Sequence, residues 1–98
     1  MSPPSATFRF AVNVTPKPGI LDPQGRAVEG ALGHLAIDGV SGVRVGRRVE
    51  LTVAASDAAA ARAVVDRLAS ELLANPLIEA WVVEEIGATS SVDSGAPA

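Results

Sequence analysis

Few residues of this chain could support catalysis. The absence of cysteine excludes disulfides, thiolate nucleophiles and sulfur metal sites, and His34, the only histidine, has no second ligand of its kind. The adjacent acids Glu84 and Glu85 fall on a predicted strand, where neighbouring side chains face opposite sides and cannot share a proton. Three serines stand in turn, cap and helix-surface contexts without a G-x-S-x-G elbow: Ser41, Ser56 and Ser70. The sequence therefore predicts no catalytic residue and no metal ligand in this chain.

A small basic cluster surrounds Gly46 and consists of Arg44, Arg47 and Arg48. These side chains could contact a phosphate or an acidic partner, or they could protect an exposed sheet edge by charge. Arg47 shares the sequence parity of the neighbouring apolar residues. It therefore either extends to the edge of the sheet or marks the point where the strand leaves its own core at a subunit contact.

The loop at residues 15–22 (TPKPGILD) is the second candidate for a contact surface. Pro16 and Pro18 stiffen the backbone on both sides of Lys17, the only lysine of the chain. A rigid connector is one interpretation, and a preorganised docking surface that loses little entropy on binding is the other. Together, the loop and the basic cluster supply the predicted partner-contact residues: Lys17, Gly19, Leu21, Asp22, Arg44, Arg47 and Arg48.

Composition narrows the classes of function further. A chain of 98 residues forms one domain at most, and 48% hydrophobic residues argue against overall disorder. The net charge of −3 makes nucleic acid an unsuitable partner, because no excess of cations faces the phosphates. We expect no signal peptide and no membrane span, since neither a basic leader nor a long apolar run is present. These features fit a cytoplasmic protein.

Apolar periodicity predicts the elements that position these candidates. Residues 7–14 alternate as a strand with one buried face. Asp22 and Pro23 have the residue types of a helix N-cap and first helical position, which predicts a helix over 23–35. A second helix is predicted over 58–74, after Ser56 and Asp57, and Asn75-Pro76 ends it. The last strand is predicted over 77–86.

The segment 43–53 carries apolar residues of a single parity, interrupted only at Arg47. Either a three-residue turn occupies 46–48, or one long strand of 11 residues bends at Gly46, and the unbroken parity favours the long strand. Its free half would present unpaired backbone groups to another copy of the chain. We therefore expect a dimer or a dimer of dimers, with interface candidates Val43, Val45, Val49 and Leu51.

The predicted fold class is α+β. Its order is β-α-β-α-β, with a three-stranded antiparallel sheet, a long bent second strand, both helices on one face and oligomerisation through the sheet. The domain is expected to span residues 7–86, between a disordered leader at 1–6 and a disordered tail at 87–98.

Three motifs in order resemble one known family. Residues 17–25 (KPGILDPQG) are similar to its K-x-G-x-L-D-P-x-G signature. Residues 43–51 (VRVGRRVEL) are similar to its V-R-x-G-K-x-x-E-L segment, and residues 73–79 (LANPLIE) to its L-L-x-N-P-x-I-E ending. The family is PurS, the small subunit of phosphoribosylformylglycinamidine synthase. The similarity extends over residues 8–85, and one departure is Trp81, where the family more often has tyrosine.

The resemblance implies a non-catalytic subunit of purine biosynthesis. Such a subunit joins a glutaminase subunit to a large synthetase subunit, and the resemblance also implies a role in the transfer of ammonia between them. It would itself carry no cofactor, because ATP, glutamine and magnesium are used by the partner subunits of this ligase. The alternative is a small-molecule-binding regulatory module of the ACT or ferredoxin-like kind, which a metabolite would stabilise against heat.

Overall fold

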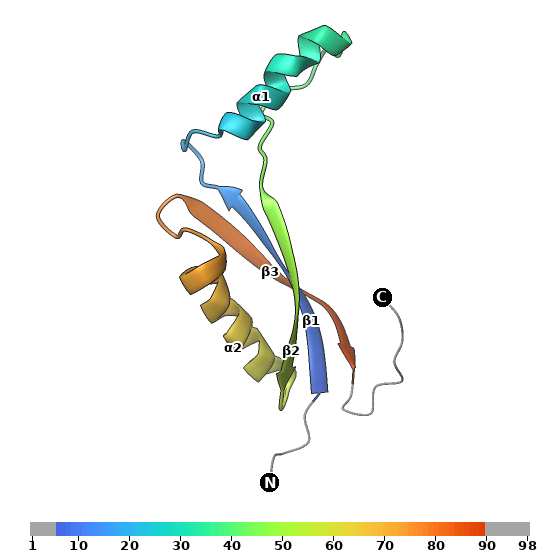
Figure 1. The fold of residues 1–98 in the computed structure, drawn as a ribbon, viewed down its shortest axis with the longest axis vertical. Coiled ribbons are helices and arrows are strands. Elements are labelled where there is room, and N and C mark those ends of the chain that lie inside the picture. The colour runs from blue at the N-terminus through green and yellow to red at the C-terminus, as the bar shows by residue number, and fades with distance from the viewer. Residues whose placement is uncertain (1–5, 90–98) are drawn as a thin grey trace.

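The computed structural model describes residues 6–89 of the chain. It contains three strands, two α-helices and two short helical extensions (Figure 1). Their bounds are β1 Ala6–Pro16, α1 Pro23–Leu32, the 3₁₀ turn η1 Gly33–Leu35, β2 Arg47–Ala55, α2 Ala58–Leu68, the π-helical turn η2 Ala69–Leu73 and β3 Glu79–Thr89. The molecule is elongated, with extents of 60 × 31 × 16 Å.

The sheet has the order β2-β1-β3, and β1 pairs antiparallel with both neighbours. Phe10 lies opposite Leu51 on one side and Glu85 on the other. The register with β3 shifts between Arg9 and Phe10, where one extra residue of β3 forms a bulge. The predicted three-stranded antiparallel sheet is confirmed.

One face of β1 makes most of the core. Its alternating residues pack against α2 and its π-helical extension, and the buried set is Phe8, Phe10, Val12, Val14, Val53, Ala61, Val65 and Ala69. Small residues on α2 let the helix approach the two phenylalanine side chains closely. The core therefore joins β1, β2 and α2, as the period-two pattern of residues 7–14 predicts.

The extent of both helices agrees with the prediction, but the position of α1 does not. Asp22 and Asp57 cap α1 and α2 by accepting hydrogen bonds from Gly25 N and Ala60 N. Helix α2 lies along the sheet, whereas α1 stands beyond its end (Figure 1). The expectation that both helices cover one face was wrong for α1, and Val28 of α1 and Leu35 of η1 are exposed.

The second strand is shorter than predicted. It begins at Arg47, and residues 43–46 are extended without belonging to the sheet. The observed parity of Val43 and Val45 nevertheless has a physical cause. The backbone N–H groups of these two residues bind side-chain carboxylates of α1 and its cap instead of a neighbouring strand. The alternation of apolar residues therefore continues from residue 43 into β2, although the backbone N–H groups of Val43 and Val45 bind carboxylates and β2 pairs with β1.

The last strand reaches three residues farther than the predicted domain boundary at residue 86. Gly87, Ala88 and Thr89 pair with Arg9, Phe8 and Thr7, so this part of the predicted disordered tail is strand. The predicted leader loses its last residue in the same way, because β1 begins at Ala6. Residues 1–5 and 90–98 lie outside the described part of the chain.

Candidate functional site

Six of the eleven exposed large apolar side chains among residues 6–89 lie on a projection that we call the arm, residues 19–46. It comprises the loop before α1, α1 itself, η1 and the return segment 36–46, which runs back to β2 (Figure 1). The arm carries six exposed large apolar side chains: Ile20, Leu21, Val28, Leu35, Ile37 and Val40. Such a surface is typical of a contact site for another protein.

Two carboxylates tie the return segment to the helix. Asp22 Oδ1 accepts a hydrogen bond from Gly25 N at 3.0 Å, and Asp22 Oδ2 accepts one from Val45 N at 2.8 Å. Glu29 Oε2 accepts one from Val43 N at 2.9 Å. In an extended segment alternate N–H groups point to the same side, so residues 43 and 45 both turn their donors toward α1. The arm is therefore closed by backbone donors and side-chain acceptors.

These hydrogen bonds lower the pKa of Asp22. The largest cause is the N–H of Gly25, followed by that of Val45, and the positive charge of Arg44 adds to the effect. The carboxylate form of Asp22 is the acceptor form, so binding of these donors favours ionisation. Asp22 acts as more than the helix cap that the sequence predicts.

We expect Asp22→Ala to destabilise the protein more than Asp57→Ala, although both residues are N-caps. Within residues 6–89 the Asp57 side chain accepts only from Ala60 N, at 2.8 Å, so its loss should cost about 1 kcal/mol, as is usual for a cap. Loss of Asp22 also frees the N–H of Val45. Thermal unfolding of the two variants provides the measurement, and equal melting temperatures would show that the bond to Val45 adds nothing.

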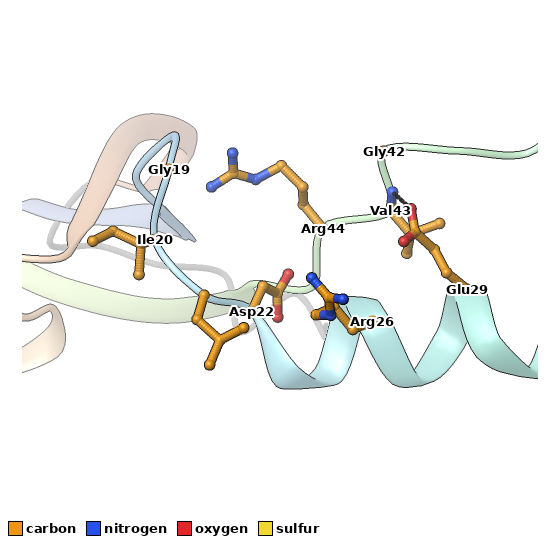
Figure 2. Close-up of a pocket in the computed structure, with 9 residues that line it drawn as sticks. Gly19, Ile20, Asp22, Arg26, Glu29, Gly42, Val43 and Arg44 are labelled. Atoms are coloured by element: carbon orange, nitrogen blue, oxygen red, sulfur yellow. Dashed lines mark hydrogen bonds between the residues drawn. The ribbon is translucent and has the colours of Figure 1, made fainter.

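A cleft of about 520 Å³ opens between the loop, the first turns of α1 and the return segment. Its lining includes Leu21, Asp22, Arg26, Glu29 and Arg44. Figure 2 shows Arg44 extending from the return segment toward the loop at Gly19, and Arg26 on the first turns of α1. Two arginines from separate elements thus line one hollow.

The loop before α1 is fixed to the sheet by its backbone. Lys17 N donates to Ile78 O at 2.8 Å, and Ile20 N donates to Lys17 O at 3.1 Å across a turn in which Gly19 has a φ of 83°. That conformation strongly favours glycine, which has no Cβ to clash with the backbone. The Lys17 side chain is half-buried and forms no ion pair with any residue between 6 and 89. Its role as a partner contact stays a prediction.

The other predicted cations differ in how they are engaged. Arg47 binds both oxygens of Glu79, at 2.8 and 2.9 Å, and also the carbonyl of Leu73. It thereby joins the start of β2 to the start of β3, which explains a charged residue on the apolar parity. Arg48 pairs with Glu50 and Glu84 on the open face of the sheet. Of this basic cluster, only Arg44 has no ion pair within the described residues.

The predicted oligomer-interface residues fall into two groups. Val49 and Leu51 pair with Val12 and Phe10 on the face of the sheet that packs on α2, so they support the core of their own chain. Val43 and Val45 lie on the arm, half-buried against α1. Their participation in an interface stays a prediction.

The Arg47–Glu79 pair should make stability depend on pH. The hydrogen bonds from Arg47 and from Asn75 N hold the pKa of Glu79 at about 2, below its ordinary value of 4.5. A depressed carboxyl pKa adds stability that is present above the ordinary value and is lost as the pH falls from 4.5 to 2. Glu79→Gln and Arg47→Gln should therefore both be less stable at pH 7 and show a shallower decline in that acid range.

Urea unfolding at a series of pH values measures this dependence. Glu79→Gln should remove this contribution altogether, whereas Arg47→Gln should keep a small part of it, because the hydrogen bond from Asn75 N to Glu79 Oε1 remains. A decline as steep as that of the wild-type protein in either variant would contradict the assignment to this pair.

The sequence prediction missed two residues of the site. Arg26 and Glu29 follow Asp22 at spacings of four and seven residues, which places all three on one side of the helix. This polar spacing was the available signal. This spacing did not reveal which groups the side chains meet, because the return segment that faces α1 lies more than ten residues farther along the chain.

Neither a cluster of metal ligands nor a membrane-spanning helix is found in the described part of the chain. No group of three His, Asp or Glu side chains among residues 6–89 could hold a metal ion. No helix of those residues is long and apolar enough to cross a membrane.

Comparisons with known proteins converge on one family. A sequence profile of PurS, described as phosphoribosylformylglycinamidine (FGAM) synthase, matches residues 9–86. The chain is 42% identical over 80 residues to the phosphoribosylformylglycinamidine synthase subunit PurS of Synechocystis sp., covering 82% of this chain and 80% of the relative.

Solved structures agree with the sequence match. The PurS subunit of Thermotoga maritima superposes with a TM-score of 0.76 at 31% identity, covering 82% of this chain and 92% of that one. A chain in the structure of PurLQS from the same organism gives 0.75 at 31% identity, covering 82% and 98%. With the three predicted motifs lying inside the matched region, the chain belongs to the PurS family of phosphoribosylformylglycinamidine synthase subunits.

Proposed function

We propose that this protein is the small, non-catalytic subunit of a phosphoribosylformylglycinamidine synthase and joins its glutaminase and synthetase subunits. The observation that carries the proposal is membership of the PurS family, together with the likeness to a chain of the PurLQS structure. The exposed apolar arm supports a role in contacts with other chains. ATP, glutamine and magnesium are used by the partner subunits, and the complex works in the cytoplasm.

The same proposal includes self-association as a dimer or a dimer of dimers. Val28 of α1 and Leu35 of η1 are large apolar residues that are exposed in a single chain. The outer edge of β2 also has no neighbouring strand within residues 6–89. Light scattering of the purified chain should give a mass of at least twice 9.9 kDa, and a monomer at micromolar concentration would contradict this part of the proposal.

Reconstitution tests the subunit role. Glutamine-dependent synthesis of formylglycinamidine ribonucleotide should require this chain together with the synthetase and glutaminase subunits from the same cells. The purified chain alone should turn over neither glutamine nor ATP. Full activity of the other two subunits in its absence would overturn the proposal, as would either turnover by the isolated chain above a mock preparation.

A further inference from the structure

The two arginines of the arm cleft differ from most other arginines of the described chain. Four arginines form ion pairs with glutamates of the same chain: Arg9, Arg47, Arg48 and Arg67. Within residues 6–89, Arg26 and Arg44 have neither an ion pair nor a side-chain hydrogen bond, although two carboxylates line the same cleft. The cleft therefore presents guanidinium groups whose donors are free.

The carboxylates of the cleft are already engaged. Both oxygens of Asp22 accept backbone hydrogen bonds, and Glu29 accepts one from Val43 N. These bonds hold the acids against the return segment, while Arg26 and Arg44 each keep five N–H donors for a ligand. A planar guanidinium matches a carboxylate with two parallel hydrogen bonds.

The surroundings favour a singly charged group attached to an apolar one. Ile20 and Leu21 border the arginines, and they are 38% and 69% exposed. The negative charges of Asp22 and Glu29 oppose a multiply charged phosphate more strongly than a single carboxylate. The protein as a whole carries a net charge of −3, so an acidic partner is attracted at this cleft and not by the overall field.

We propose that Arg26 and Arg44 bind a carboxylate side chain of a partner subunit in this cleft, with a neighbouring apolar side chain of that subunit packed on Ile20 and Leu21. This inference rests on the proposed function, since it names the chemistry by which the arm recognises the synthetase or the glutaminase. It assigns the specificity of the contact to two residues on different elements. The hydrogen bonds that Asp22 and Glu29 accept from Val45 N and Val43 N hold together the two elements that carry these arginines.

Neutral substitutions test the contact. Arg26→Gln, Arg44→Gln and the double variant are titrated into the synthetase and glutaminase subunits, and the midpoint of glutamine-dependent synthesis is measured. We expect the double variant to shift the midpoint by about 10-fold or more, as for loss of a desolvated charge pair in an interface. Arg67→Gln is the matched control, since it removes the same charge from an arginine that is 78% exposed on α2.

The melting temperatures of the free variants separate binding from folding, because neither arginine forms an ion pair or a side-chain hydrogen bond within residues 6–89. Wild-type midpoints for the double variant would overturn the inference while leaving the subunit role intact. A wild-type chain that fails to assemble with either subunit would overturn both. An equal loss with Arg67→Gln would show a general effect of charge and would also overturn the inference.

Cross-linking identifies the acid directly. Arg44→Lys keeps the charge and introduces an amine, and Lys17 is the only lysine of the natural chain. A carbodiimide should then join the new lysine to an Asp or Glu of a partner subunit, in a cross-link that mass spectrometry finds in this variant and not in the wild-type complex. If inorganic phosphate or acetate at millimolar concentration instead stabilises the isolated chain, and the double variant loses that stabilisation, the cleft binds a free anion and the proposed partner contact is wrong.

Discussion

Phe10→Ala is expected to remove about 3–5 kcal/mol from the free energy of unfolding, the usual cost of truncating a fully buried phenylalanine. Phe10 is 0% exposed and lies at the middle of the central strand, between Leu51 on β2 and Glu85 on β3. Its ring belongs to the core formed with Ala61, Val65 and Ala69 of the helical layer. Most of these neighbours are small and cannot move to fill the cavity.

The consequence is large because the domain is small. Domains of this size have only about 5–15 kcal/mol of stability in total, so the variant should be substantially unfolded near physiological temperature. Urea unfolding at one fixed protein concentration measures the loss, since self-association would add a concentration-dependent term. Val82→Ala is the control: this residue is 66% exposed on β3, and its truncation should change stability by about 0.5 kcal/mol at most. A similar loss for both variants would show that the core is not where the structure places it.

Gly25→Ala is expected to destabilise the arm, by about 1–3 kcal/mol as for overpacking in a close contact. A Cβ on residue 25 would collide with the carbonyl oxygen of Val43 and with the carboxylate of Asp22. The carbonyl belongs to the backbone, so relief of the collision requires the return segment to move away from α1. That movement would lengthen the bonds from Val45 and Val43 to their carboxylates and widen the cleft between Arg26 and Arg44.

Gly30→Ala in the same helix is the matched comparison. A Cβ at residue 30 meets no atom within 4 Å, so this variant should gain roughly 0.5–1 kcal/mol from better helix propensity. The opposite signs separate the close approach at Gly25 from the general effect of alanine in a helix. Thermal unfolding gives the stabilities, and titration into the partner subunits should show weaker assembly for Gly25→Ala alone. Stabilisation by both substitutions would contradict the close packing of the return segment.

Local patterns were sufficient to predict most elements of this fold. Alternation of Phe8, Phe10, Val12 and Val14 predicted the buried face of β1, because strand geometry turns every second side chain to one side. The two helix starts were predicted from Asp22 and Asp57, since a capping carboxylate acts on backbone groups only three residues away. The three family motifs likewise depend on short stretches of sequence.

The tertiary structure decided where these elements lie and which polar groups meet. Both helices were expected on one face of the sheet, but whether α1 covers its own sheet depends on the direction in which the loop after β1 leaves the end of the sheet. The single parity of residues 43–53 suggested one strand, yet the N–H groups of Val43 and Val45 bind Glu29 and Asp22. A backbone donor is satisfied equally by a strand or by a carboxylate, and the sequence pattern does not distinguish the two.

The candidate site shows the same division. The sequence identified Lys17, Arg44, Arg47 and Arg48 as cations that could contact a partner, and it alone supplied the family motifs. It could not separate the engaged cations from the free ones, because Arg47 meets Glu79 and Arg48 meets Glu84 only through the pairing of distant strands. Arg26 and Arg44 are eighteen positions apart and share a cleft only because α1 and the return segment fold back on each other. Charge is a property of the residue, but whether a charge is already paired is decided by the fold.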